Sequence, residues 1–138
     1  MSERLQNTQS GKHVCCPMPY GRVLIVDDVE INLYVASRLM ELYKLQIDTA
    51  ANGIEALEII NSKDEYDIIF MDHMMPVMDG IETTKHLRDS GYTGTIAALT
   101  ANTAEDADMY LQNGFDVYLP KPIDIRQLDR ILNIYVRN

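Results

Sequence analysis

The chain has 138 residues, of which 46% are apolar and 24% are charged, as is typical of one globular domain with one hydrophobic core. Its formal net charge of −9, with Lys and Arg scattered along the chain, argues against direct binding to nucleic acid. No apolar stretch approaches the roughly 20 residues that cross a bilayer, and the N-terminus lacks an apolar signal-peptide core. We therefore expect a cytoplasmic protein without membrane insertion.

The N-terminal segment, residues 1–21, is polar and aperiodic, and it ends in two prolines and a glycine. This composition predicts a flexible linker or extension, with the folded domain at residues 22–138. The segment contains the adjacent cysteines Cys15 and Cys16, which match neither a disulfide framework nor a zinc site. We expect free thiols there.

The first predicted elements are a strand, a helix and a second strand. Residues 23–26 form a continuous apolar run, which indicates a strand buried on both faces. A second strand is expected at residues 46–50, where apolar and polar residues alternate. The stretch between them has helical spacing, with these residues on its apolar face: Leu33, Ala36, Met40 and Tyr43.

The same alternation continues through the middle of the chain. Asn52 and Glu55 are spaced as in a capping box and predict the start of the second helix. A third strand is expected at residues 67–71. Asp79, followed three residues later by Glu82, predicts the start of the third helix.

The last four elements complete the pattern. A fourth strand is expected at residues 95–99, followed by a helix that Thr103 caps and Gly114 ends. A fifth strand is expected at residues 117–119, and Asp124 begins the last helix.

Five strands that alternate with five helices predict an α/β fold with a parallel sheet, because parallel neighbours need crossover connections. Right-handed crossovers reduce the number of topologies. For this size we expect the flavodoxin-like, doubly wound sheet with strand order 2-1-3-4-5. In that order the ends of strands 1 and 3 lie side by side, where open α/β sheets bind their ligands.

Polar residues follow four of the predicted strands. Asp27 and Asp28 follow the first strand, Asp72 the third, Thr100 the fourth, and Lys121 comes shortly after the fifth. Carboxylates about 4 Å apart repel by roughly 4 kcal/mol per pair at an effective dielectric near 20, so protons or a cation must offset the charge. A few hard oxygen ligands suit Mg²⁺, which keeps waters and leaves room for a phosphate.

This set of residues predicts phosphoryl chemistry. An aspartate can act as a nucleophile toward phosphorus, and the protein then mainly has to position groups and stabilise charge. Asp72 is the best candidate because it ends the central strand. Asp27 and Asp28 would hold the metal, Thr100 would donate to a phosphoryl oxygen, and Lys121 would supply positive charge.

Four sequence segments closely resemble the motifs of response-regulator receiver domains, most of all those attached to hybrid histidine kinases. The resemblance extends from about Arg22 to the C-terminus. The four segments are Leu24 to Asp28 (LIVDD), Phe70 to Gly80 (FMDHMMPVMDG), Ala98 to Asn102 (ALTAN) and Leu119 to Ile123 (LPKPI).

The resemblance implies the roles of the site residues. Asp72 would accept a phosphoryl group from a phosphohistidine of a histidine kinase or a histidine phosphotransfer domain. Mg²⁺, or Mn²⁺ in its place, would be bound by Asp27, Asp28, Asp72 and the backbone carbonyl of Met74. Lys121 would pair with the phosphoryl group.

The resemblance also implies a conformational switch. Thr100 would move toward the phosphoryl oxygens while Tyr118 changes rotamer, and the bond from Lys121 to Pro122 is often cis in this family. The readout surface would comprise the fourth and fifth strands with the helices that follow them. Such a domain catalyses only its own phosphorylation and slow autodephosphorylation, and a receiver homodimer is a further assembly to consider.

Other interpretations remain at this point. A Mg²⁺-dependent phosphatase of the haloacid dehalogenase type also uses a phosphoaspartate, but it would need Asp-x-Asp after the first strand and a cap domain. A mononucleotide-binding domain and a docking module without phosphorylation are further alternatives. Tyr118 could merely fill a half-buried face, and His73 and His86 are more simply surface or rim histidines than phosphorelay residues.

Overall fold

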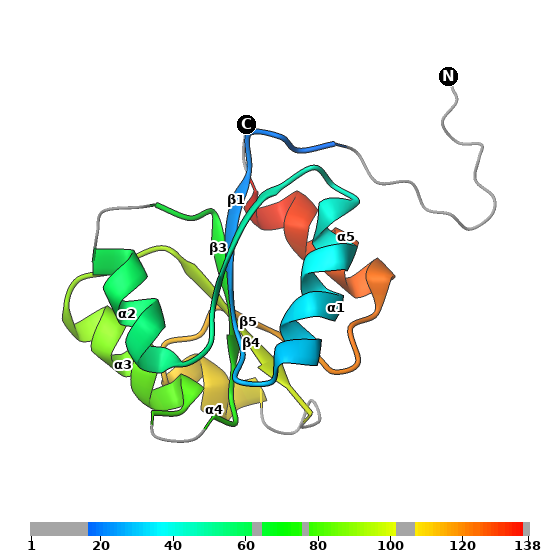
Figure 1. Cartoon of the computed structure of the whole chain (residues 1–138). Coiled ribbons are helices and arrows are strands. Elements are labelled where there is room, and N and C mark those ends of the chain that lie inside the picture. The colour runs from blue at the N-terminus through cyan, green and yellow to red at the C-terminus, as the bar shows by residue number, and fades with distance from the viewer. Residues whose placement is uncertain (1–16, 62–64, 76–77, 102–106, 137–138) are drawn as a thin grey trace.

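The computed structural model describes residues 17–61, 65–75, 78–101 and 107–136. These residues form a parallel sheet with the strand order β2-β1-β3-β4-β5, which confirms the predicted topology (Figure 1). The elements in chain order are β1 (Arg22–Val26), α1 (Glu30–Glu41), β2 (Gln46–Ala50), α2 (Gly53–Asn61), β3 (Ile68–Asp72), α3 (Gly80–Asp89), β4 (Thr95–Thr100), α4 (Ala107–Gln112), β5 (Val117–Pro120) and α5 (Ile125–Tyr135).

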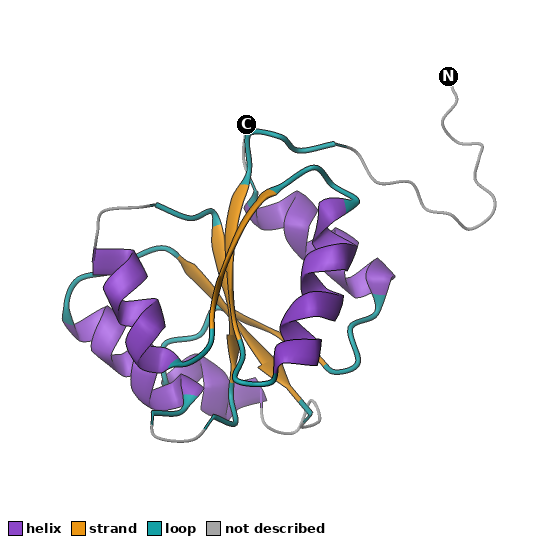
Figure 2. Cartoon of the chain, in the orientation of Figure 1, coloured by secondary structure: helices purple, strands orange, loops and turns teal. Residues whose placement is uncertain are grey.

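The helices cover both faces of the sheet. Figure 2 shows helices on both sides of the strands, which Figure 1 labels as α1 and α5 on one side and α2 and α3 on the other. α4 belongs to the face of α2 and α3, because its Tyr110 is part of the second core cluster. Side chains along a strand alternate between the faces, so Val23 and Ile25 belong to the first core cluster, and Leu24 and Val26 belong to the second. All five residues of β3 are buried, which is expected for the central strand of a sheet covered on both sides.

Short polar contacts fix the predicted helix starts. The side chain of Asp79 accepts a hydrogen bond from the backbone N–H of Glu82 at 2.8 Å, and that of Asp124 accepts from Arg126 at 2.8 Å. Asn52 Oδ1 likewise accepts from the N–H of Glu55 at 2.8 Å. The predicted Thr103 cap lies outside the described residues.

Most boundaries agree with the sequence prediction to within a residue or two. β4 and β5 each extend one residue further than expected, because Thr100 pairs with Pro120. α1 ends at Glu41, but Tyr43 beyond it is still fully buried in the core, as its spacing predicted. Gly114 follows α4 with a φ of 100°, which agrees with the predicted helix stop.

The last residues of the expected N-terminal linker lie against the domain. Met18 is 3% exposed, belongs to the first core cluster, and donates its backbone N–H to the carbonyl oxygen of Tyr43 at 2.6 Å. Residues 1–16, including both cysteines, lie outside the described residues. In the part of the chain that is described, no helix combines the length and the apolar character needed to cross a membrane.

Candidate functional site

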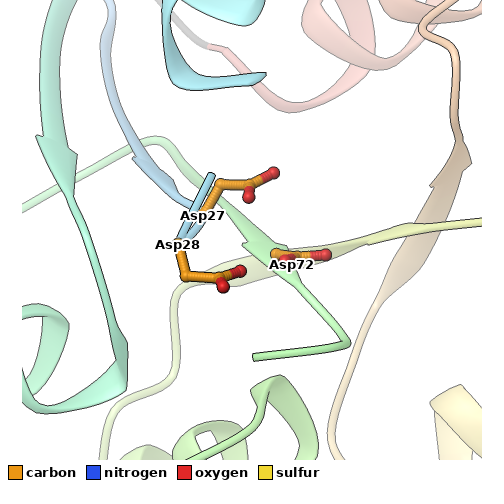
Figure 3. Close-up of side chains that lie close together, drawn as sticks. All are labelled: Asp27, Asp28 and Asp72. Atoms are coloured by element: carbon orange, nitrogen blue, oxygen red, sulfur yellow. The ribbon is translucent and has the colours of Figure 1, made fainter. Parts of the chain in front are cut away.

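Three aspartates lie together at the carboxyl ends of β1 and β3. Asp27 and Asp28 directly follow β1, and Asp72 is the last residue of β3. One carboxylate oxygen from each lies within 4.8 Å of the other two (Figure 3). Asp27 and Asp72 are buried, with exposed fractions of 1% and 3%, whereas Asp28 is exposed. The structure thus brings together the carboxylates that were expected to converge.

The sheet register explains why these aspartates meet. Val26 pairs with Met71, so the next residues, Asp27 and Asp72, lie at the same level at the ends of neighbouring strands. The backbone N–H of Asp27 donates to the carbonyl oxygen of Ala50 at 3.1 Å, and its side chain accepts from the N–H of Val29 at 2.9 Å. These two bonds fix both the backbone and the carboxylate of Asp27.

Lys121 joins the cluster from the loop after β5. Its Nζ lies 2.8 Å from Asp72 Oδ1 and 3.2 Å from Asp27 Oδ2. Its backbone N–H donates to the carbonyl oxygen of Thr100 at 2.8 Å, and its bond to Pro122 is cis, as the resemblance implied. A single ammonium group therefore faces carboxylates from two strands, and the site retains excess negative charge.

The electrostatics of the site are visible in two pKa shifts. The pKa of Asp72 is raised from 3.8 to about 6 in total, mainly by burial and in smaller part by the charges of Asp27 and Asp28, while Lys121 lowers it. For Lys121, burial lowers the pKa, but the contacts with Asp72 and Asp27 outweigh it and the net shift is upward. The lysine therefore stays charged at neutral pH, while Asp72 ionises less readily than an ordinary aspartate.

The chemistry of the donors fits a hard divalent cation. Three carboxylates supply oxygen ligands only, and no sulfur or imidazole ligand belongs to this cluster among the described residues. A divalent ion would offset the repulsion that raises the pKa of Asp72. The site thus suits Mg²⁺, which prefers one or a few carboxylates together with water and phosphate oxygens.

Thr100 lies at the same end of the sheet, and it contacts a residue that the sequence did not single out. Its Oγ1 is 2.6 Å from Oη of Tyr110 on α4, and that Oη is also 3.0 Å from Nδ1 of His73. Thr100 and Tyr110 are both buried, and His73 is half-buried. In the sequence, Tyr110 lies within the predicted fourth helix, four residues before Gly114, and that position does not specify a partner for its hydroxyl.

The remaining candidates do not touch the carboxylates in any described contact. Tyr118 on β5 is half-buried and stacks on Tyr110, with ring centroids 6.5 Å apart. The side chain of Met74 is 72% exposed, and the atom predicted to bind the metal is its backbone carbonyl oxygen. His86 lies exposed on α3.

Comparison with known proteins gives the class. Residues 23–133 match the response regulator receiver domain family. The receiver domain of the Saccharomyces cerevisiae response regulator Ssk1, in a co-crystal with the histidine phosphotransfer protein Ypd1, is 31% identical, with a TM-score of 0.76 over 89% of this chain and 91% of that chain. The receiver domain of the sensor histidine kinase PA1611 from Pseudomonas aeruginosa, with magnesium in its active-site cleft, is 33% identical, with a TM-score of 0.74 over 83% of this chain and 96% of that chain.

The chain belongs to the response regulator receiver domain family, the phosphoacceptor switches of two-component signalling. Two-component system protein A of Emericella nidulans is 41% identical over 83% of this chain and 17% of its own length. Hybrid signal transduction histidine kinase E of Dictyostelium discoideum is 38% identical over 90% of this chain. The chain spans 12 to 17% of the length of the first three curated relatives. Neither the family match nor the structural neighbours support the phosphatase alternative.

Proposed function

We propose that Asp72 is the phosphoacceptor of this receiver domain and that it takes the group from a phosphohistidine in the presence of Mg²⁺. The observation that carries the proposal is the convergence of three carboxylate oxygens within 4.8 Å, with Lys121 Nζ 2.8 Å from Asp72. A carboxylate oxygen of Asp72 forms a bond to phosphorus while the bond from phosphorus to the histidine nitrogen breaks, and the electron pair leaves with that nitrogen.

Each neighbour of Asp72 has a role in this transfer. Asp27, Asp28, Asp72 and the carbonyl oxygen of Met74 would hold the ion, and Mn²⁺ can replace Mg²⁺ with the same oxygen ligands. When bound, the ion neutralises charge on the attacking carboxylate and the phosphoryl oxygens. The ammonium group of Lys121 would pair with a phosphoryl oxygen.

Thr100 and Tyr118 form the switch in this proposal. After transfer, Thr100 donates its hydroxyl to a phosphoryl oxygen, and Tyr118 changes rotamer on β5. The added charge of about −1.5 to −2 provides the driving force. The surface formed by β4, α4, β5 and α5 reads out the change.

The donor in this proposal is a histidine kinase or a histidine phosphotransfer domain. Support comes from the relatives, which include hybrid histidine kinases, and from the complex between Ypd1 and the receiver of Ssk1. A cytoplasmic location, a receiver homodimer and the lack of nucleic-acid binding remain predictions. In this proposal the domain catalyses only its own phosphorylation and a slow autodephosphorylation.

Intact-mass measurement after incubation with acetyl phosphate and Mg²⁺ tests the proposal. We expect one added phosphoryl group, stable in acid and labile in base, that is absent in Asp72→Ala and in the presence of EDTA. Asp89→Ala, an exposed aspartate at the end of α3, serves as the matched control and should be phosphorylated normally. Modification that persists in Asp72→Ala would refute the assignment.

A further inference from the structure

A buried tyrosine hydroxyl on α4 connects two residues that lie next to the phosphorylation site. Tyr110 is 1% exposed, and its Oη lies 2.6 Å from Thr100 Oγ1 and 3.0 Å from His73 Nδ1. Thr100 ends β4, and His73 directly follows Asp72 at the end of β3. One hydroxyl therefore contacts the ends of both strands.

The ring of Tyr110 is held in place by other aromatic side chains. His73 and Phe115 meet it edge to face, with centroids 5.3 Å and 5.6 Å away, and Tyr118 stacks on it at 6.5 Å with an interplanar angle of 22°. Because the ring is packed from several sides, its hydroxyl has a defined position. A displacement of the ring must also affect Tyr118.

We propose that Tyr110 is a positioning residue that holds the Thr100 hydroxyl in the unphosphorylated domain and transmits its movement to α4 and Tyr118. The inference rests on the proposed function, because it assumes that Thr100 donates to the phosphoryl group on Asp72. It adds an intermediate residue between the two expected switch residues, Thr100 and Tyr118.

The number of available protons gives the coupling its direction. A threonine hydroxyl has one proton to donate. When Nδ1 of His73 is the acceptor, Tyr110 donates to His73 and Thr100 donates to Tyr110. Thr100 then cannot donate to a phosphoryl oxygen without giving up its bond to Tyr110.

When Thr100 gives up this bond, the buried hydroxyl of Tyr110 loses one hydrogen-bond partner. That loss costs free energy unless the surrounding residues rearrange. With this donor assignment, the contact between Thr100 and Tyr110 stabilises the unphosphorylated arrangement relative to the phosphorylated one. A contact that forms in only one of two conformational states shifts the equilibrium toward that state by the free energy of the contact. Removal of the Tyr110 hydroxyl should therefore favour the phosphorylated arrangement.

Tyr110→Phe tests this, because it keeps the ring and removes only the hydroxyl. We expect phosphorylation by acetyl phosphate at fixed Mg²⁺ to be about fivefold faster, which corresponds to one ordinary hydrogen bond. The Mg²⁺ affinity should stay unchanged. In a Thr100→Ala background, the same substitution should have no effect on the rate, since the partner is already absent.

Tyr43→Phe is the matched control, since Tyr43 is fully buried on the opposite face of the sheet and donates to Asp129 Oδ1 at 2.8 Å. It should reduce stability without a change in phosphorylation rate. A structural role for Tyr110 alone would make the two variants behave alike.

A second measurement does not depend on phosphorylation. In the metal-free domain, the Thr100 side-chain rotamer reported by NMR couplings should be single in the wild type and mixed in Tyr110→Phe. The inference is overturned if the wild type is phosphorylated at Asp72 while Tyr110→Phe changes neither the rotamer nor the rate. If the rotamer changes but the wild type cannot be phosphorylated, the proposed function fails, whereas the contact between Tyr110 and Thr100 stands.

Discussion

At the scale of single residues, the site is defined by an imbalance of charge. Two buried aspartates and one exposed aspartate face a single ammonium group, whose Nζ lies within 3.2 Å of the two buried carboxylates. Carboxylates at such distances repel strongly in a partly buried setting. Repulsion among the three carboxylates therefore destabilises the folded site until a bound cation or proton offsets their charge.

Asp72→Asn should stabilise the metal-free domain at neutral pH. The pKa of Asp72 in the folded state, about 6, lies above its ordinary value of 3.8, so the folded state binds the proton more tightly than the unfolded state. The stabilisation that the wild type gains from this bound proton is fully present below about pH 4 and is lost as the pH rises through 6. We expect the variant to be more stable than the wild type by up to about 3 kcal/mol at pH 7.5 in EDTA.

Urea unfolding at several pH values measures this difference. The advantage of Asp72→Asn should shrink as the pH falls from 7 toward 4.5. A variant that is less stable than the wild type at pH 7.5 would contradict the direction of the shift.

Lys121→Ala should separate metal binding from phosphorylation. Removal of the ammonium group leaves the three carboxylates in place, so Mg²⁺ binding should survive and be equal to or tighter than that of the wild type. Phosphorylation should be slower by tenfold or more, a factor that corresponds to about 1.4 kcal/mol of lost transition-state stabilisation. Calorimetric Mg²⁺ titration and intact mass report the two properties, and loss of metal binding would overturn the role assigned to the lysine.

At the scale of elements, the start of α3 packs closely against the end of β3. A Cβ added at Gly80 would overlap the backbone carbonyl oxygen of Asp72, and the N–H of Gly80 donates to the carbonyl oxygen of His73 at 3.0 Å. The glycine therefore permits the approach that sets the position of Asp72. Asp79 fixes the same turn as the N-cap of α3.

Gly80→Ala should destabilise the domain by about 1–3 kcal/mol and also weaken Mg²⁺ binding, because the end of β3 must move. Gly91→Ala is the matched control. Gly91 has a φ of 98° and nothing near its Cβ position, so this variant should lose stability through backbone strain alone. Thermal unfolding and Mg²⁺ titration of both variants check this, and equal Mg²⁺ affinities would contradict it.

The elements also show what can be predicted from a sequence. A continuous apolar run indicated β1, and the cap residues Asp79 and Asp124 indicated two helix starts, because these signals are local. The parallel sheet then brought Asp27 to Asp72, as the strand order requires.

Contacts that depend on side-chain packing could not be predicted in this way. The hydroxyl contact between Tyr110 and Thr100 joins a helix to a strand end, and no local pattern specifies it. The position of Met18 also depends on tertiary contacts. Its neighbouring prolines indicated a linker, yet its side chain packs into the core beside Tyr43.

At the scale of the whole molecule, a bound ion should stabilise the fold through the site. A ligand that binds only the folded state stabilises it by about 2.7 kcal/mol at one hundred times its Kd, or roughly 8 °C in Tm for a domain of this size. We expect Mg²⁺ to raise Tm and EDTA to reverse the effect. Asp28→Asn, at an exposed position, should abolish most of the rise, whereas Asp89→Asn should retain it. An equal rise in both variants would place the ion elsewhere.

The most direct measurement of the central claim is a crystal structure of the domain with Mg²⁺ and a beryllofluoride group as a phosphoryl analogue. The account predicts one ion bound by Asp27, Asp28, Asp72 and the carbonyl oxygen of Met74, with beryllium on a carboxylate oxygen of Asp72 and a fluorine beside Lys121. An ion that contacts only one of the three aspartates, or an analogue attached to another residue, would contradict it.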